Sequence, residues 1–432
     1  MYGRFKLLNI SYNKNMKIRE EKGSVSILVI VTVLFIVALL TTMYFSAVNR
    51  KNAGDEATKI IKQAYEKNVN NMDDLYATYI ENGLYIYTKE DLEQFRERVN
   101  SGVSFEGKTV YLMNNIDLNI GNYTEDKDGS ISFNEGAIQW EPIGSLTNPF
   151  KGTFEGNNYE IYGAYINNEE KNNYGLFGYN SGIIQNLGLN KSYIKTQNKE
   201  GRVGGIVGNN SGNIKNCYNK ASIIGSFAVG GISGSNSGTI ENCYNIGNIQ
   251  VNSSQTNNIY CGGICGMMNK TSIIKLSYNS GNISVQSSCI DVTKAIKAGG
   301  ILGSNAENGK VTNCYNSGKI EITKSKINCF IAGIVGGNNG QECEVSNCYN
   351  IGNVIIMDNQ GTDANLEGGI LTGKDENVSN CYYLENTSKQ GSSSKVEVKT
   401  EEEMKTEEFV KLLGEDIWII QKGKNNGYPT FR

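Results

Sequence analysis

The sequence predicts a mainly β protein: a parallel β-solenoid, with a transmembrane helix and a helical stalk before it and small α/β caps at its ends. A glycine-led apolar tetrad recurs seven times, and the phrase Asn-Cys-Tyr-Asn, or a relative of it, follows each copy. The interval between tetrads varies from 26 to 37 residues. A fixed phrase with variable filler indicates one supersecondary unit stacked on copies of itself. The tetrads begin at Gly175, Gly205, Gly231, Gly263, Gly300, Gly333 and Gly369.

The first 48 residues predict a membrane anchor. Residues 24–48 form a 25-residue segment without charge, rich in Val, Ile and Leu. As a helix this segment exceeds the ~30 Å hydrocarbon core of a bilayer. Residues 1–23 form a basic leader with six Lys or Arg against two Glu, which the positive-inside rule keeps in the cytoplasm. We therefore predict a single-pass protein of the cell membrane, with the lipid bilayer as partner of residues 24–48 and the C-terminal region extracellular.

The junction Glu21-Lys22-Gly23-Ser24 resembles the leader junction of type IV pilin-like proteins. The resemblance implies cleavage after Gly23, a mature chain that begins at Ser24, and assembly into a pilus-like filament. Two positions depart from that family. Leu28 stands where a glutamate is expected, and Ser24 stands where an aromatic residue is expected. A plain single-pass anchor is therefore the favoured alternative.

Residues 49–84 carry an apolar stripe at helical spacing, which predicts a stalk that continues the membrane helix. Residues 85–170 predict an N-terminal cap and the first solenoid strands. A short strand precedes a helix capped by Thr88, with Asp91 completing an acidic capping box. We expect further strands over Thr109–Leu118 and Phe150–Tyr162, the latter with an Asn-Asn turn.

Residues 171–385 contain the repeats, and no helix-period stripe occurs among them. Each unit consists of short β-prone runs bounded by Gly, Asn and Ser, which predicts three strands per coil and seven to ten coils. Right-handed coiling is the default for parallel crossovers. The polar insertions Asn252–Asn258, Ser287–Lys297 and Met357–Leu366 predict loops that bulge from one corner.

Half of the ten cysteines share one repeat position. These five predict an interior ladder of small apolar side chains, in which Ser277 stands for one member. Disulfides between Cys261 and Cys265, or between Cys343 and Cys348, are the alternative. The ladder residues are Cys217, Cys243, Cys314, Cys348 and Cys381.

A tyrosine follows each residue of the cysteine column. Adjacent strand residues face opposite sides of a sheet, so inward cysteines predict an outward tyrosine column. Such a column predicts a ligand-binding platform for sugar rings or a partner protein. The alternative is that the rings stiffen the solenoid face or pack under corner loops. The tyrosines are Tyr218, Tyr244, Tyr278, Tyr315, Tyr349 and Tyr382.

Residues 386–432 predict a C-terminal cap that hides the last coil. A helix is expected over Thr400–Leu413, where a threonine start precedes an acidic first turn. Trp418 and Gly427–Phe431 predict a final pair of strands.

Several phrases together resemble the bacterial surface proteins built of GLUG repeats. They are Asn-Ile-Asp-Leu, Trp-x-Pro-Ile-Gly, Phe-x-Gly-x-Phe-x-Gly-Asn-Asn, Gly-Leu-Phe-Gly and the repeated Gly-Gly-Ile-x-Gly, found from about Tyr85 onward. The resemblance implies an exported β-solenoid of adhesin-like character. GLUG repeats also occur beside the catalytic domain of bacterial immunoglobulin A peptidases. Those enzymes need a His-Glu-x-x-His zinc site, and this chain contains no histidine.

One segment is a candidate metal site. Thr124–Glu135 resembles an EF-hand loop, which implies that Asp126, Asp128 and Glu135 hold calcium. Thr124 replaces the aspartate required at the first position, so a solvated acidic loop is the alternative. No other cofactor is expected.

The composition excludes several functions. Without histidine there is no Ser-His or Cys-His pair for nucleophilic catalysis. A net charge of −3 without a basic cluster beyond the membrane edge argues against nucleic acid as a partner. We expect a non-enzymatic surface protein that binds glycans or proteins. The alternatives are a pilin-like filament or secretion component, and a polysaccharide-active β-helix enzyme.

Overall fold

A computed structural model describes residues 85–126, 130–254, 257–358, 365–389 and 394–432. The predicted leader 1–23 with its Gly23–Ser24 junction, the span 24–48 and the stalk 49–84 lie outside these residues. Within the described ranges, none of the helices has the length and apolar character needed to cross a bilayer.

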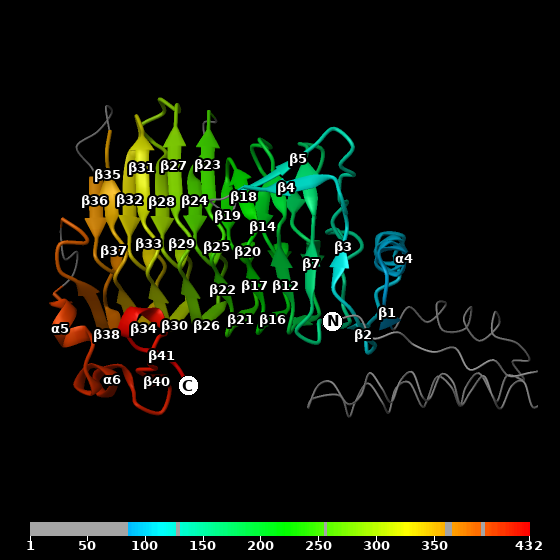
Figure 1. The fold of residues 1–432 in the computed structure, drawn as a ribbon. Coiled ribbons are helices and arrows are strands. Elements are labelled where there is room, and N and C mark those ends of the chain that lie inside the picture. Colours follow the sequence, from blue (N-terminus) through cyan, green and yellow to red (C-terminus); the bar gives the residue numbers. More distant parts are fainter. Residues whose placement is uncertain (1–84, 127–129, 255–256, 359–364, 390–393) are drawn as a thin grey trace, which may run out of the picture. The chain divides into compact units, whose positions relative to one another are not determined.

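The described chain is a parallel β-solenoid of about seven turns, as the repeats predict. Each turn passes through four sheets, here called I to IV in chain order (Figure 1). The strands in these sheets pair in parallel with the equivalent strand of the next turn. The register matches from repeat to repeat in most pairs, and it shifts after Val285 and after Val335.

The strands of each sheet follow the order of the turns. Sheet I contains β9 (Asn173–Tyr174), β14 (Arg202–Gly204), β19 (Ala228–Gly230), β24 (Ile259–Gly262), β28 (Ala295–Gly299), β32 (Asn328–Ala332) and β36 (Asn365–Gly368). Sheet II contains β10 (Phe177–Asn180), β15 (Val207–Asn210), β20 (Ser233–Asn236), β25 (Cys265–Met268), β29 (Leu302–Asn305), β33 (Val335–Asn338) and β37 (Leu371–Gly373). Sheet IV contains β8 (Tyr165–Asn167), β13 (Tyr193–Lys195), β18 (Ser222–Gly225), β23 (Ile249–Ser253), β27 (Ile283–Ser287), β31 (Ile320–Lys324) and β35 (Val354–Ile356).

Sheet III is the longest and begins as two parallel rows that merge at β26. One row contains β1 (Tyr85–Ile86), β2 (Thr109–Leu112), β6 (Thr153–Glu155), β11 (Ile183–Gln185), β16 (Asn213–Lys215) and β21 (Thr239–Glu241). The other contains β3 (Ile116–Asp117), β7 (Glu160–Tyr162), β12 (Gly188–Asn190), β17 (Tyr218–Asn219) and β22 (Tyr244–Asn245). Both rows continue as β26 (Ile273–Asn279), β30 (Lys310–Asn316), β34 (Glu344–Asn350) and β38 (Asn377–Leu384), which β39 (Val396–Lys399) extends.

The prediction of three strands per coil was wrong, because each complete turn supplies four or five. Within the run Val203–Gly208 the chain bends at Gly205–Ile206, so that β14 ends before the bend and β15 begins after it. In the early turns an asparagine with positive φ, such as Asn216 at 53°, separates the two rows of sheet III. These bends use one or two residues, which is too short to interrupt the hydrophobic pattern of the sequence.

The two repeated phrases are adjacent inside each turn. The first glycine of a tetrad lies against the last asparagine of the following phrase: a Cβ on Gly263 would collide with the side chain of Asn279 and with the carbonyl oxygen of Gly300 in the next turn. The same contact recurs for Gly231 with Asn245. Glycine is therefore required here by close approach of the backbone.

The interior asparagines form a continuous hydrogen-bonded ladder along the axis. Each donates to the Oδ1 of the next at 2.8 Å. Each also donates to a carbonyl two residues ahead. The buried amides are thus satisfied, as close packing in a low-dielectric core demands. The ladder residues are Asn219, Asn245, Asn279, Asn316 and Asn350.

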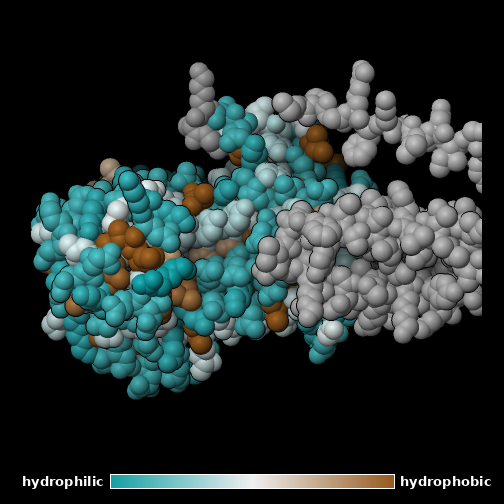
Figure 2. Space-filling view, turned by 60° about the horizontal axis from the view of Figure 1, so that its bottom comes forward, coloured by the Kyte–Doolittle hydropathy of each residue, from teal (hydrophilic) through white to brown (hydrophobic). Residues whose placement is uncertain are grey.

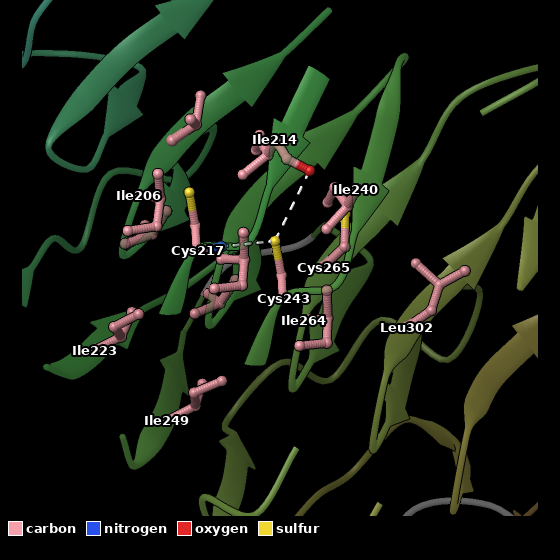
Figure 3. Close-up of a cluster of buried hydrophobic side chains, with 14 of the residues drawn as sticks. Ile206, Ile214, Cys217, Ile223, Ile240, Cys243, Ile249, Ile264, Cys265 and Leu302 are labelled. Carbon is pink, nitrogen blue, oxygen red and sulfur yellow. Dashed lines mark hydrogen bonds between the residues drawn. The ribbon is translucent and has the colours of Figure 1, made fainter. Parts of the chain in front are cut away.

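The hydrophobic core fills the space enclosed by the four sheets. Figure 3 shows part of it, with Ile206, Ile214 and Cys217 next to Cys243 and Ile264. All ten cysteines are buried and free, so neither of the two alternative disulfides forms. The five ladder cysteines are at most 1% exposed. Their thiols donate to backbone carbonyls, Cys243 Sγ to Glu241 O at 3.2 Å for example.

A helix covers the N-terminal end of the solenoid. Helix α4 (Lys89–Asn100) begins after Thr88, whose Oγ1 accepts from Asp91 N at 3.2 Å while Asp91 Oδ2 accepts from Thr88 N at 3.0 Å. Leu92, Phe95 and Val99 are buried against the first turns. The expected strands Thr109–Leu118 and Phe150–Tyr162 form β2, β3, β6 and β7, and both residues of the Asn157–Asn158 turn have positive φ.

The C-terminal segment is arranged differently from the expected cap. It contains α5 (Glu401–Met404), α6 (Glu407–Leu413), β40 (Trp418–Ile419), a 3-10 turn (Asn425–Gly427) and β41 (Thr430–Phe431). These elements, here called the C-terminal arm (400–432), pack on the outer face of sheet III. The last turn is crossed instead by residues 385–389, where Thr387 O accepts from Val354 N at 2.7 Å and Lys389 Nζ lies 3.1 Å from Glu367 Oε1.

Figure 2 shows the molecule turned so that the lower side of Figure 1 comes forward. The surface there is mostly hydrophilic, and apolar residues appear as separate patches, the largest toward the C-terminal part of the chain. Within the arm, the large side chains of Trp418 and Phe409 are nevertheless buried.

Candidate functional site

A column of tyrosines runs along the outer face of sheet III. The register of the strands places one tyrosine from each turn beside the next. The rings from Tyr218 to Tyr349 are stacked, with centroids 4.8 to 5.1 Å apart and planes within 7° of parallel. The predicted outward orientation follows from the inward cysteines beside them.

The stacking determines what the column can offer a ligand. A ring in the middle of the stack has both faces against its neighbours, so its edge and its hydroxyl are what remain for contacts with other molecules. Tyr244 and Tyr278 are half-buried, and the structure gives their hydroxyls no partner among the described residues. The column therefore presents a row of phenol groups about 4.9 Å apart, rather than the flat ring faces on which sugars stack.

The C-terminal arm covers the later half of the column. Tyr315, Tyr349 and Tyr382 are 3%, 0% and 4% exposed. Trp418 lies 5.4 Å from the Tyr349 ring, and the Tyr349 hydroxyl donates to the carbonyl of Pro429. The prediction that these three tyrosines face a ligand was therefore wrong, because the arm buries them in a second apolar cluster.

The arm covers the tyrosine column only as far as Tyr278. The ring of Phe431 lies 6.5 Å from the Tyr278 ring and 5.6 Å from the Tyr315 ring. Tyr218 and Tyr244 have no ring contact with the arm. We call Tyr218, Tyr244 and Tyr278 the open end of the tyrosine column.

A glycine and a glutamate terminate the column before its first ring. In register, Glu160 of β7 pairs with Gly188 of β12, and Gly188 pairs with Tyr218 of β17. A side chain at Gly188 would collide with the Tyr218 ring, so the ring leans over this glycine. Its hydroxyl thereby reaches Glu160 Oε1 at 2.5 Å, across two strands.

Glu160 is the centre of a polar cluster at this end. It accepts hydrogen bonds from Tyr162 and Tyr218, and from Asn190 Nδ2 at 3.3 Å. Lys220 Nζ lies 3.1 Å from Glu160 Oε1 and 5.0 Å from the centroid of the Tyr218 ring.

These contacts govern the ionisation of the cluster. Burial of Glu160 opposes its ionisation, but the hydrogen bonds outweigh burial and hold its pKa at about 2. The bond to Glu160, together with burial, raises the pKa of Tyr162 to about 12. Burial and the same carboxylate raise the pKa of Tyr218 well above its usual range. At neutral pH the cluster thus holds a carboxylate and neutral phenols.

Glu160 and Gly188 were missed by sequence reasoning. The available signal was the first copy of the repeat, where Leu187-Gly188-Leu189 replaces the Cys-Tyr pair. A glycine in place of the tyrosine marks the end of the column, but the partner of Tyr218 lies 58 residues earlier in the chain.

The candidate calcium segment forms a β-hairpin. Strands β4 (Tyr123–Glu125) and β5 (Ile131–Phe133) pair in antiparallel fashion, whereas an EF-hand has helices on both sides of its loop. Asp126 and Glu135 are exposed, and Asp128 lies outside the described residues. Asp126 Oδ2 accepts from Ser130 Oγ at 3.3 Å. The described residues do not bring three potential metal ligands together here.

The buried thiols are poor nucleophiles. Burial raises the pKa of Cys261 and of Cys265 well above the usual range for a thiol. A thiol that stays protonated does not attack or bind metal readily.

Comparisons with known proteins found a family model, a relative and a solved structure that resemble this chain or parts of it. The family model described as "The GLUG motif" matches residues 200–224 and 295–321. A protein of Evansella cellulosilytica named "Putative Gly-rich membrane protein" is 34% identical over 138 residues, which are 32% of this chain. The matched part spans 14% of the length of that relative. The crystal structure of "a putative immunoglobulin A1 protease" from Bacteroides ovatus covers 81% of this chain, and 91% of its own, with a TM-score of 0.44 and 20% identity.

Proposed function

We propose that this chain is a membrane-anchored, extracellular, non-enzymatic protein that binds a glycan or a protein through the open end of its tyrosine column. The observation that carries the proposal is that the C-terminal arm covers the tyrosine column no further than Tyr278. Tyr218, Tyr244 and Tyr278 are only half-buried, whereas the three later tyrosines are buried.

The geometry of the open end supports recognition by hydrogen bonds along an extended ligand. The hydroxyls of Tyr244 and Tyr278 lie on a sheet fixed by hydrogen bonds between turns, so these two donors keep their spacing without a ligand. The Tyr218 hydroxyl donates to Glu160. Preorganised polar groups lose little conformational entropy on binding. Glu160 and Lys220 add a charged boundary at one end.

Two further observations support a place at the cell surface. GLUG motifs lie within the solenoid, and the relative from Evansella cellulosilytica is named as a membrane protein. The uncharged segment 24–48 would supply the anchor.

The proposal is tested with the purified full-length chain on glycan and matrix-protein arrays. We expect ligands bound by the wild type to be lost by the double variant Tyr244→Phe/Tyr278→Phe, which removes two hydroxyls and keeps both rings. The matched control is Tyr193→Phe, a tyrosine on sheet IV. Equal binding by the double variant would refute the site.

Failure of the wild type to bind any array would instead favour a stiffening role for the column. Release of soluble fragments from an arrayed polysaccharide would contradict the non-enzymatic assignment.

A further inference from the structure

The predicted insertions all leave the solenoid at the same corner, between sheet IV and sheet I. They connect β23 to β24, β27 to β28 and β35 to β36, and each of these pairs leads from sheet IV to sheet I. The tyrosine column is on sheet III, so these loops belong to another face and have no part in the function proposed above.

A hollow opens at this corner, and we call it the corner hollow. Its volume is about 330 Å³, at the lower end of the range for small-ligand pockets. Connections from four successive turns and the outer face of sheet I line it. The lining residues are Glu200, Arg202, Phe227, Asn257, Asn258, Tyr260 and Lys294.

The register of sheet I explains why the hollow forms here. Arg202 of β14 pairs with Ala228 of β19, and Ala228 pairs with Tyr260 of β24. The neighbours Val203, Val229 and Cys261 are buried in the core, so the first three face outward. Two long side chains thus stand two strands apart, with the smallest side chain of the row between them.

The hollow combines aromatic and amide groups. The Phe227 and Tyr260 rings meet edge to face, with centroids 5.7 Å apart and planes at 78°. Asn258 Oδ1 accepts from Ala295 N at 2.9 Å, and its Nδ2 donates to Tyr260 Oη at 3.3 Å. These contacts hold the aromatic wall in place before a ligand arrives.

The charge at the hollow is positive, in contrast to the net charge of −3 of the whole chain. Arg202 and Lys294 line it, and Lys297 Nζ lies 5.8 Å from the centroid of the Tyr260 ring. Within the described ranges none of these three cations forms an ion pair. The pKa of Asp291 is lowered mainly by its hydrogen bonds to Thr293, and the positive charge of Lys294 lowers it further. Glu200 is the carboxylate among the lining residues.

We propose that the corner hollow binds a carboxylate-bearing sugar residue of an acidic polysaccharide. Arg202 and Lys294 bind the carboxylate, and the Tyr260 ring packs against the sugar ring. Aromatic and amide groups beside the cations favour a sugar over an acidic peptide, which would need cations alone.

The test is calorimetric titration of the full-length protein with tri-galacturonate and with its methyl ester, which has the same rings without the charges. We expect the acid to bind at least about tenfold more tightly, the difference associated with one charge-assisted hydrogen bond. Arg202→Gln and Lys294→Gln should each weaken binding of the acid by about tenfold or more. Tyr260→Leu should weaken binding of the acid and of the ester.

Two control variants separate this site from other effects. Lys215→Gln removes an exposed cation of sheet III and should leave binding unchanged, which excludes a general effect of charge. Tyr244→Phe should also leave it unchanged, so that failure here and failure of the tyrosine-column proposal are distinguishable. Thermal melts of every variant check that the fold is kept.

Several results would overturn the proposal. They are equal affinity for acid and ester, an unchanged affinity of folded Arg202→Gln, and absence of any binding of the acid by the wild type. Equal or tighter binding of a poly-glutamate peptide would also overturn it, because the hollow would then recognise acidic chains rather than sugars.

Discussion

The bend between the two rows of sheet III is held by a residue with positive φ in each turn. Asparagine occupies this position in most turns, and its side chain adds a second, outer ladder: Asn242 Nδ2 donates to Asn216 Oδ1 at 2.8 Å. Leu276 has the same conformation, with φ of 52°, and interrupts that ladder. A left-handed conformation costs an L-residue about 1–2 kcal/mol, and asparagine tolerates it best after glycine.

Leu276→Asn should therefore stabilise the protein. We expect the free energy of unfolding to rise by about 1 kcal/mol, from relief of backbone strain and from restored amide contacts to Asn242 and Asn313. Urea denaturation followed by circular dichroism measures the change. Leu276→Ala is the control, since alanine lacks the amide and should give no gain. A destabilised Leu276→Asn would show that the leucine contributes more by packing than it costs in strain.

Alkaline pH should destabilise the arm side of the tyrosine column. Burial raises the pKa of Tyr315 to about 12, whereas an exposed tyrosine titrates near pH 10. Between about pH 10 and 12 the unfolded chain binds fewer protons than the folded one, so stability falls as pH rises through that window. Phenolate absorbance at increasing pH measures this, with the urea-unfolded chain as reference. Titration of all tyrosines near pH 10 in the folded protein would contradict the described burial.

At the scale of elements, the glycine-led tetrad and the Asn-Cys-Tyr-Asn phrase of one repeat pack against each other. The interior column of Asn219 to Asn350 needs the glycines beside it, and its amides are satisfied only as a continuous ladder. This explains why the two phrases occur together while the filler between them varies. The sequence predicted the cysteine and tyrosine columns, since each repeats a single residue type, but it did not predict the asparagine ladder.

Asn279→Ala should break this ladder at its middle. The change removes the acceptor of Asn245 Nδ2 and the donor to Asn316 Oδ1, each at 2.8 Å. Loss of partners for buried polar groups costs about 1–3 kcal/mol each, so we expect about 2–4 kcal/mol less stability in urea denaturation. Ser280→Ala, at the exposed neighbour, should change little. A loss below 0.5 kcal/mol, on the order of a surface substitution, would show that the ladder is dispensable.

Other elements could not be predicted from the sequence for physical reasons. The bends at Gly205 and at Asn216 are too short to alter the hydrophobic periodicity. The sequence therefore predicted three strands per coil where the early turns have five. The arm carried ordinary helix and strand signals, and Thr400 caps α5 as expected. Its position on sheet III depends on contacts such as Trp418 with Asn313, 105 residues apart, which no local pattern encodes.

Trp418→Ala should detach the arm without unfolding the solenoid. Trp418 is fully buried and contacts the rings of Tyr349 and Phe431. Removal of such a side chain costs about 3–5 kcal/mol of stability. We expect the packing of the arm, rather than the solenoid, to lose this stability. Limited proteolysis with mass spectrometry should show early cleavage within residues 400–432 and a resistant core. Leu412→Ala, at a residue 45% exposed, is the control. A protease-resistant arm in Trp418→Ala would contradict this account.

At the scale of the whole molecule, the repeats form one scaffold with two distinct faces. Sheet III carries the tyrosine column, and the corner between sheets IV and I carries the loops of variable length. The asparagine and cysteine columns of the core set the register of the turns. A change of loop length at that corner therefore leaves the tyrosine column on sheet III in place.

The anchor prediction is tested on intact cells. External protease should digest the solenoid of wall-stripped cells, because residues 24–48 would hold it outside the membrane. Survival of the repeat region under these conditions would place it inside. Mass spectrometry of the mature N-terminus separates two versions: a chain that begins at Ser24 indicates pilin-type processing, whereas residues before Gly23 indicate a plain anchor.

The C-terminal arm has a mechanical consequence. Adjacent turns of the solenoid share backbone hydrogen bonds in every sheet, whereas the arm contacts sheet III through side chains such as Trp418 and Tyr349. Tension applied at the C-terminus would load the arm first and peel it away one contact at a time. The turns beneath would resist together in shear, and each step of peeling would expose another tyrosine, so that a pulled molecule would expose a longer row of tyrosines than a relaxed one.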